Sequence, residues 1–165
     1  MKSFKAIGYH GTDEEDLEIN FDLPTNDVFL GRGFYIWRDS YEERAITWKN
    51  SQYVYEVEVS CPKDEMLNFT LVNWNKELDI IRLYLKYFKP KNIYFGEFID
   101  FLIDKMNVDI KLVTIMDLKN KPTKIHIQDP YENKNKTIFS YGDIQICIKD
   151  SSALVKDIQK VTYES

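Results

Sequence analysis

The sequence has little glycine, little cysteine and no long apolar run. Its 165 residues include 6 glycines and 2 cysteines. Cys61 and Cys147 stand far apart and outside any CxxC pattern, which argues against a disulfide framework and a cysteine-based zinc site. No apolar run reaches the roughly 18 residues of a membrane span, and no apolar block follows the charged N-terminus as in a secretory signal. These absences favour a cytoplasmic protein without a metal.

An excess of positive charge is also missing. The chain carries 22 Lys and Arg against 27 Asp and Glu, a formal net charge of −5. Tight non-specific binding of nucleic acid needs a basic field, so this balance disfavours it, although a local basic groove is compatible with it. Hydrophobic residues make up 44% of the chain, as in folded domains. The length predicts one domain, spanning residues 1–165.

The spacing of apolar residues predicts an α+β fold. Helical periodicity over 74–88 and 95–106 predicts two helices, and a capping box at Ser40 and Glu43 predicts another, ending near Asn50. A closing helix is expected around 152–160. Alternating or glycine-bounded apolar segments predict strands near 4–9, 31–37, 53–59, 110–116, 123–128, 136–140 and 143–149.

Two glycine-rich segments carry the first candidate site residues. His10 follows a short predicted strand and is followed by Gly11 and Thr12. A lone histidine is more often structural, but glycine lets the backbone approach a ligand closely. Further along, Gly31-Arg32-Gly33-Phe34-Tyr35 places a glycine-lined backbone beside an aromatic ring, which suits a flat ligand. A strand bulge is the simpler alternative, and a Rossmann motif is excluded because the GxGxxG spacing is missing.

A late strand supplies the third candidate. Alternation places three isoleucines of 143–149 on the core face and four other side chains on the opposite face: Asp143, Gln145, Cys147 and Lys149. Taken alone, this opposite face is most simply an ordinary solvated one.

Together the segments resemble the ADP-ribosyltransferase-like clan, most closely a little-characterised bacterial branch. That branch carries YHGS or YHGT, then GRGFY, a WA-type helix, a Y-x-V or Y-x-L strand and a late QI strand. The resemblance covers about residues 7–60 and 140–155, with support from helices alone between 75 and 135. The matching segments are Tyr9-His10-Gly11-Thr12, Gly31-Arg32-Gly33-Phe34-Tyr35, Thr47-Trp48, Tyr53 to Val59 and Gln145-Ile146.

The resemblance implies a split pair of small, bent antiparallel sheets that hold NAD+ in a cleft. His10 is then expected to hydrogen-bond the ribose next to nicotinamide. Gly11 is expected to bind the carboxamide through its backbone, with Thr12 close by. Tyr35 is expected to stack on the nicotinamide ring. The resemblance also adds Gly33 to the cofactor-binding set, together with Arg32, for which contact with the pyrophosphate and simple solvation both remain open.

The catalytic position departs from the common pattern of the clan. Many members have a glutamate where this chain has Gln145, whereas the bacterial branch also has glutamine. Glutamine keeps the hydrogen bond to the ribose 2′-hydroxyl but lacks the charge that opposes the developing cation. Asp143, two residues earlier, matches a position that orients or deprotonates the acceptor in some relatives. We expect Asp143 to act as a general base.

The activity implied by the resemblance is NAD-dependent mono-ADP-ribosyl transfer to a macromolecule, either protein or nucleic acid. A compact chain of this kind suits a bacterial or phage toxin or defence effector, for which an antitoxin or inhibitor protein is a candidate partner. Two alternatives remain: an NAD glycohydrolase, in which water replaces the acceptor, and an inactive module that binds NAD, ADP-ribose or a partner protein.

Overall fold

The structure of the protein, a computed structural model, describes seven stretches of the chain: residues 2–22, 30–38, 52–70, 75–117, 123–129, 134–141 and 143–161. For residue 75 and within 116–143 the description covers the backbone and not the side chains. The helix predicted from Ser40 to Asn50 lies outside the described residues.

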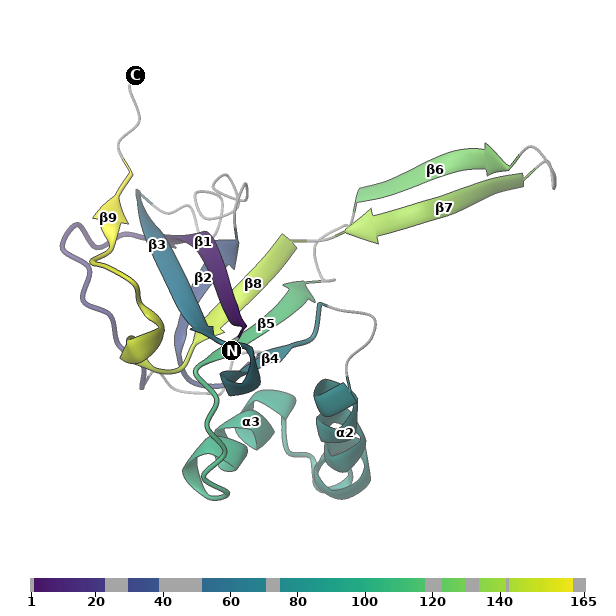
Figure 1. The fold of residues 1–165 in the computed structure, drawn as a ribbon, viewed down its shortest axis with the longest axis horizontal. Helices are drawn as coiled ribbons and strands as arrows, with labels where there is room; N and C mark the ends of the chain where they lie inside the picture. Colours follow the sequence, from purple (N-terminus) through teal and green to yellow (C-terminus); the bar gives the residue numbers. More distant parts are fainter. Residues whose placement is uncertain are drawn as a thin grey trace.

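A seven-stranded mixed sheet forms the centre of the molecule (Figure 1). All neighbouring strands are antiparallel except the parallel pair β4–β5. In spatial order the strands are β4 (Met66–Asn68), β5 (Leu112–Asp117), β8 (Asp143–Ile148), β2 (Phe34–Arg38), β1 (Ser3–Thr12), β3 (Tyr53–Pro62) and β9 (Gln159–Lys160). The hairpin of β6 (Thr123–Asp129) and β7 (Lys134–Tyr141) projects away from this sheet (Figure 1).

The helices lie together on one side of the sheet, next to β4 and β5 (Figure 1). Helix α2 (Asn75–Leu83) continues into the π-helical turn η3 (Tyr84–Phe88) and the 3-10 turn η4 (Lys89–Lys91), and α3 (Phe95–Asp104) follows. Two further 3-10 turns are η2 (Lys63–Glu65) and η5 (Ser151–Ala153). None of the helices in the described stretches has the length and apolar character needed to cross a membrane.

Both faces of the sheet are covered by packed side chains. One face packs against the irregular segments 17–21 and 153–158 and buries residues that include Phe34, Ile36, Val57, Val59, Ile146 and Ile148. The other face packs against the helices and buries residues that include Leu67, Phe98, Ile99, Leu102, Val113 and Cys147. Strand β8 therefore contributes to both cores, so the face expected to be solvated is buried at Cys147.

The structure confirms an α+β fold, the helices predicted over 74–88 and 95–106, and the predicted strands in their approximate places. One strand extends further than predicted: β1 runs to Thr12, so His10 lies within it. The sheet also differs from the pair of small antiparallel sheets that the resemblance implied. Strand β8 pairs with both β2 and β5, which joins all the main strands into one mixed sheet.

The closing helix predicted around 152–160 is wrong. Asp150 does cap a helical turn, because its Oδ1 accepts a hydrogen bond from the Ser152 backbone N–H at 2.8 Å. The turn ends after Ala153, and the following backbone joins the edge of β3. Leu154 bridges to Val59, and the Val155 N–H donates to the Glu58 carbonyl at 3.1 Å. Pairing with a sheet edge thus replaces the hydrogen bonds of a longer helix.

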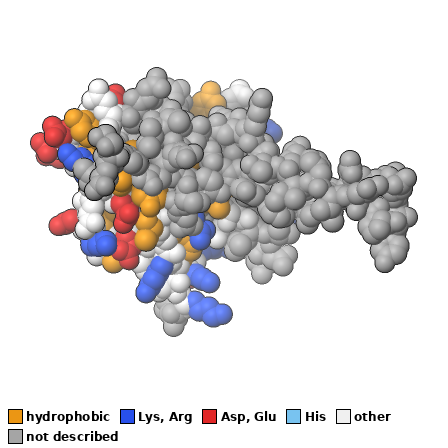
Figure 2. Space-filling model, turned by 90° about the horizontal axis from the view of Figure 1, so that it is seen from above, with side chains coloured by type: hydrophobic (Ala, Val, Ile, Leu, Met, Phe, Trp, Pro, Cys, Tyr) orange, Lys and Arg blue, Asp and Glu red, His pale blue; other side chains and the backbone are white. Residues whose placement is uncertain are grey.

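Charge is unevenly distributed over the described surface. On the face seen in Figure 2, Lys and Arg side chains gather along one edge, while acidic and basic side chains are interspersed at one end. A net charge of −5 is therefore compatible with a locally basic edge.

Gly31 allows the turn that leads into β2 to approach α3, which provides a test of the fold. Its φ is +87°, and a Cβ would lie 2.5 Å from the Gly96 carbonyl oxygen and 2.7 Å from both Asp100 carboxylate oxygens. We expect Gly31→Ala to lower the free energy of unfolding by more than ~1 kcal/mol in denaturant titrations. The exposed substitution Lys105→Ala should change it by less than ~0.5 kcal/mol. Equal unfolding midpoints for both variants would contradict this turn geometry.

Candidate functional site

Three neighbouring strands carry the residues that the motifs single out. In the order β8-β2-β1, these strands hold Gln145, Tyr35 and His10. Gln145 pairs with Trp37, which in turn pairs with Tyr9, the residue before His10. Segments from the beginning and the end of the chain thus meet in one part of the sheet.

His10 bonds to the backbone of β2 just past the point where the β1–β2 ladder ends. That ladder comprises Gly8 with Arg38 and Tyr9 with Trp37. The imidazole Nδ1 of His10 lies 2.6 Å from the Tyr35 carbonyl oxygen, and the His10 ring centroid lies 4.2 Å from that of Phe34.

The protonation of His10 follows from these contacts. A carbonyl can only accept a hydrogen bond, so Nδ1 carries the proton. Burial lowers the pKa of His10, although the Tyr35 carbonyl and the Glu14 carboxylate oppose this shift. At neutral pH the imidazole is therefore uncharged, and Nε2 is an acceptor.

Gly11 and Thr12 complete the end of β1. They pair with Val54 and Tyr53 of β3, so this end of β1 is held from the β3 side. The Thr12 hydroxyl oxygen accepts from the Glu14 N–H at 3.2 Å, which shapes the exit from the strand. Both residues are half-buried, like His10.

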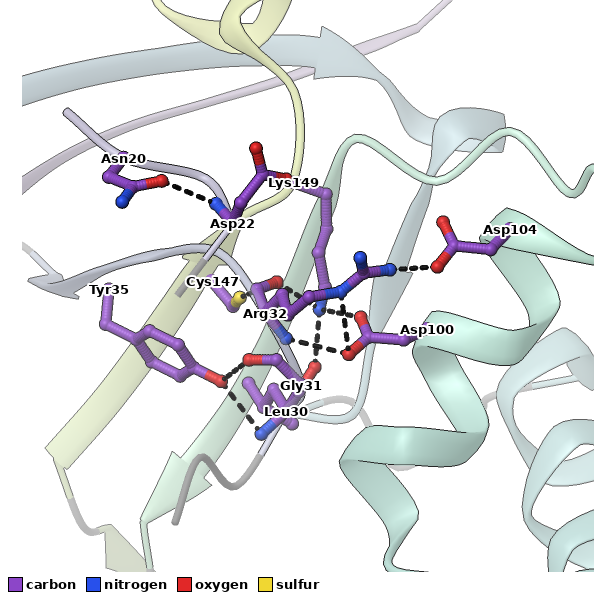
Figure 3. A network of polar contacts seen from close by, with 10 residues as sticks. All are labelled: Asn20, Asp22, Leu30, Gly31, Arg32, Tyr35, Asp100, Asp104, Cys147 and Lys149. Carbon is purple, nitrogen blue, oxygen red and sulfur yellow. Dashed lines mark hydrogen bonds and ion pairs between the residues drawn. The ribbon is translucent and has the colours of Figure 1, made fainter. Parts of the chain in front are cut away.

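Tyr35 is fixed by its hydroxyl and by the packing of its ring. Its hydroxyl donates to the Gly31 carbonyl at 2.5 Å and accepts from the Leu30 N–H at 3.0 Å, as Figure 3 shows. The half-buried ring packs against the core under the helices. Burial raises the pKa of Tyr35 well above its ordinary value, so the hydroxyl stays protonated. It anchors the turn and cannot serve as a base at neutral pH.

A buried ion pair holds the turn before β2. The Lys149 side chain is 4% exposed and that of Asp100 is 9% exposed, and Lys149 Nζ lies 3.0 Å from Asp100 Oδ1. Lys149 also donates to the Leu30 carbonyl at 2.7 Å and to the Arg32 carbonyl at 2.5 Å (Figure 3). Asp100 Oδ2 accepts from the Arg32 N–H at 2.9 Å. The network therefore ties α3 and the end of β8 to the turn.

Arg32 points toward α3. Its Nε lies 3.5 Å from Asp100 Oδ2, and its terminal nitrogen contacts the Asp104 carboxylate. The Arg32 side chain is therefore paired with α3 and not simply solvated, and its expected contact with the pyrophosphate stays a prediction. Gly33 has a packing role, because a Cβ there would lie 2.7 Å from the Ile148 carbonyl oxygen.

Sequence reasoning missed Lys149 and Asp100 as functional candidates. Lys149 looked like the solvated end of a strand, and Asp100 lies among the apolar residues of α3. The signal in the sequence is a glycine, Gly96, one helical turn before Asp100. In the structure both are buried and face the close approach of Gly31.

Neither cysteine is an activated nucleophile. Both are free and lie in separate cores. Burial raises the pKa of Cys61 and of Cys147 to about 11, so both remain thiols at neutral pH. Cys147 Sγ lies 3.6 Å from the Arg32 carbonyl oxygen, a further contact to the turn.

Gln145 and His10 project from opposite faces of the sheet. Gln145 is half-buried and shares a row with Trp37 and Ile115. Alternation places Tyr35 on the same face. His10 packs instead on Phe34, which belongs to the core of the other face. The three expected site residues thus lie on neighbouring strands, but their side chains do not share one face.

The side chain of Asp143 lies outside the described part of the structure, and its backbone pairs with Asp117.

A cavity of about 630 Å³ lies elsewhere, lined by Leu17, Ile19 and residues 154–158. None of the predicted site residues whose side chains the structure describes lines it. Within the described stretches, no group of three or more His, Cys, Asp or Glu side chains is arranged to hold a metal ion.

Comparison with known proteins identifies no relative: no family model matches the sequence, and no curated protein and no solved structure matches it significantly.

The ion pair leads to a prediction about stability. Lys149→Met removes the buried cation of Asp100 and leaves only the more distant, partly exposed guanidinium of Arg32, so we expect a loss of ~3 kcal/mol in the free energy of unfolding. Arg32→Ala removes a side chain that is 35% exposed, and the expected loss is below ~1 kcal/mol. Denaturant titration of both variants measures the difference. Equal losses, or a larger loss for Arg32→Ala, would contradict the network.

The buried imidazole leads to a prediction about pH. Burial lowers the pKa of folded His10 below 6.5, so on acidification the unfolded chain binds a proton first. The contribution of His10 to stability is thus complete above pH 6.5 and is lost as the pH falls through the folded value. We expect His10→Gln to reduce the loss of stability between about pH 7.5 and about pH 5.5, measured by thermal unfolding. His126 of β6 is the other of the 2 histidines, and His126→Gln is the control. The prediction fails if His10→Gln retains the wild-type slope.

Proposed function

We propose that this protein is an NAD-dependent mono-ADP-ribosyltransferase that modifies a macromolecule. The observation that carries the proposal is the meeting of β8, β2 and β1, which brings Gln145, Tyr35 and His10 into one part of the sheet. The direct bond from His10 to the Tyr35 backbone supports a functional link between the two motifs.

His10 and Gly11 are assigned to the ribose and the carboxamide. The neutral imidazole of His10 has an acceptor at Nε2, which suits a ribose hydroxyl. The β1–β2 ladder ends at Tyr9, directly before these two residues. The backbone of Gly11, with Thr12 beside it, is assigned to the nicotinamide carboxamide at this place.

Tyr35 and Gln145 are assigned to the other face. The anchored hydroxyl of Tyr35 makes its ring a rigid platform, and the exposed part of that ring is assigned to the nicotinamide. Gln145 is assigned to the ribose 2′-hydroxyl. Nicotinamide leaves with the electrons of its bond to ribose, and the oxocarbenium-like centre takes the acceptor nucleophile, whose proton passes to Asp143.

A second candidate, a module that binds NAD or ADP-ribose without turnover, is favoured by one observation. Gln145 supplies a hydrogen bond but no charge against the developing cation. Calorimetry that detects NAD binding, combined with the absence of nicotinamide release, would favour this candidate.

The transferase proposal is tested with labelled NAD and a cell lysate, followed by separate digestion with protease and nuclease. Label lost on protease treatment identifies a protein acceptor, and label lost on nuclease treatment identifies a nucleic-acid acceptor. We expect His10→Ala and Gln145→Ala to abolish labelling, whereas the exposed control Lys5→Ala keeps it. Nicotinamide release without an acceptor would indicate a glycohydrolase, and no label would count against transfer.

The charge at Gln145 provides a sharper test. A carboxylate keeps the hydrogen bond to the 2′-hydroxyl and adds electrostatic stabilisation of the cation-like centre. We expect Gln145→Glu to raise nicotinamide release by about 10-fold or more. Gln145→Leu, of similar volume but without polar groups, should abolish release. A Gln145→Glu variant that is folded and slower than the wild type would refute this role of Gln145.

A further inference from the structure

We infer that Asp100 and Lys149 are positioning residues for His10. The ion pair between α3 and the end of β8 fixes the turn at residues 30–33, and the turn fixes Tyr35, whose carbonyl holds the imidazole. The expected effect on NAD chemistry rests on the proposed function. The mechanical coupling between the ion pair and the imidazole is independent of that function.

The first step runs from the ion pair to the turn. A lysine ammonium has three hydrogens, and those of Lys149 point to the Leu30 carbonyl, the Arg32 carbonyl and the Asp100 carboxylate. Asp100 uses its second oxygen for the Arg32 N–H. Three backbone groups of one short turn are therefore held by two buried side chains, which leaves the turn little freedom (Figure 3).

The second step runs from the turn to the imidazole. The Tyr35 hydroxyl is bound to Gly31 and Leu30, while the Tyr35 carbonyl accepts the proton of His10 Nδ1. The ring of the neighbouring Phe34 packs against the imidazole with centroids 4.2 Å apart. The Tyr35 backbone also pairs with Cys147 of β8, two residues before Lys149, so the turn and the end of β8 together set the position of the acceptor that selects the His10 tautomer.

A second ion pair in the molecule serves as a matched control. Lys111 Nζ lies 3.0 Å from Glu65 Oε2, the same separation as in the pair of Lys149 and Asp100. Lys111 lies just before β5, and its side chain bonds to Glu65. Its backbone carbonyl accepts from the Lys149 N–H at 2.8 Å, a bond that Lys111→Met keeps. Its removal tests the loss of a lysine and an ion pair of equal length without touching the turn.

The pair can be removed as a unit, and the three backbone groups of the turn that it binds then lose these partners. Buried ion pairs replaced by apolar side chains of similar volume often leave a protein as stable as before. The double variant Asp100→Leu/Lys149→Met therefore removes the bonds to the turn without leaving an unpaired charge. Asp100→Asn is the milder change, because one of the two oxygens that accept from Lys149 and from the Arg32 N–H becomes an NH2 group, which can only donate.

Imidazole nitrogen NMR on selectively labelled histidine reads the outcome directly, since the chain has only 2 histidines. In the wild type we expect His10 as the Nδ1–H tautomer. In the double variant and in Asp100→Asn, we expect both tautomers and a pKa closer to 6.5, with Glu14 as the charged group facing the ring. His126 should give the same signals throughout, and Lys111→Met should leave both histidines as in the wild type.

If the double variant folds and its His10 signals equal those of the wild type, the inference is overturned. If the double variant does not fold, wild-type His10 signals in Asp100→Asn overturn it. Where the wild type transfers ADP-ribose, we expect Asp100→Asn to lower kcat by about 10²-fold with little change in KM. A wild type without turnover would refute the proposed function alone, because the NMR result does not depend on activity.

Discussion

The buried ion pair of Lys149 and Asp100 is the constraint on which this part of the molecule depends. The two residues are 49 positions apart, and both contact a turn near the beginning of the chain. Removing two charges from water is costly, and the cost is offset only when the remaining hydrogen-bonding groups are also satisfied. All three ammonium hydrogens and both carboxylate oxygens meet that condition here.

The turn explains why charged side chains are needed at this place. It lies between α3 and the end of β8, so its backbone N–H and C=O groups are shielded from water and need partners. No ladder supplies them, because β2 begins only at Phe34. Side chains therefore supply them: Lys149 and Asp100 from one side and the Tyr35 hydroxyl from the other. The resulting rigidity extends along β2 to the carbonyl that binds His10.

Patterns within short segments predict the helices and strands, whereas contacts between distant segments determine which side chains of the candidate site are neighbours. Helical spacing gave the two helices, and alternation correctly put Ile146 and Cys147 on opposite faces of β8. Neither pattern predicts which strands become neighbours. The burial of Cys147 and the pairing of Leu154 with β3 therefore could not be predicted from the sequence. The motifs did select residues on adjacent strands. The face that each side chain occupies depends on the register between β1 and β2, which no local pattern encodes.

The glycine-aromatic motif before and within β2 has a structural explanation that is independent of catalysis. Gly31 and Gly33 allow the turn to lie against α3 and β8, Arg32 binds α3, and the Tyr35 hydroxyl closes the turn. The chemistry of the proposed site is thereby concentrated in His10 and Gln145, a neutral imidazole and an amide. Such groups stabilise a developing cation through hydrogen bonds and not through opposite charge, and each such bond contributes less than a charged one. In the proposed site, stabilisation of the developing cation therefore depends on accurate positioning of neutral groups. The inferred coupling to the buried ion pair provides that positioning for His10.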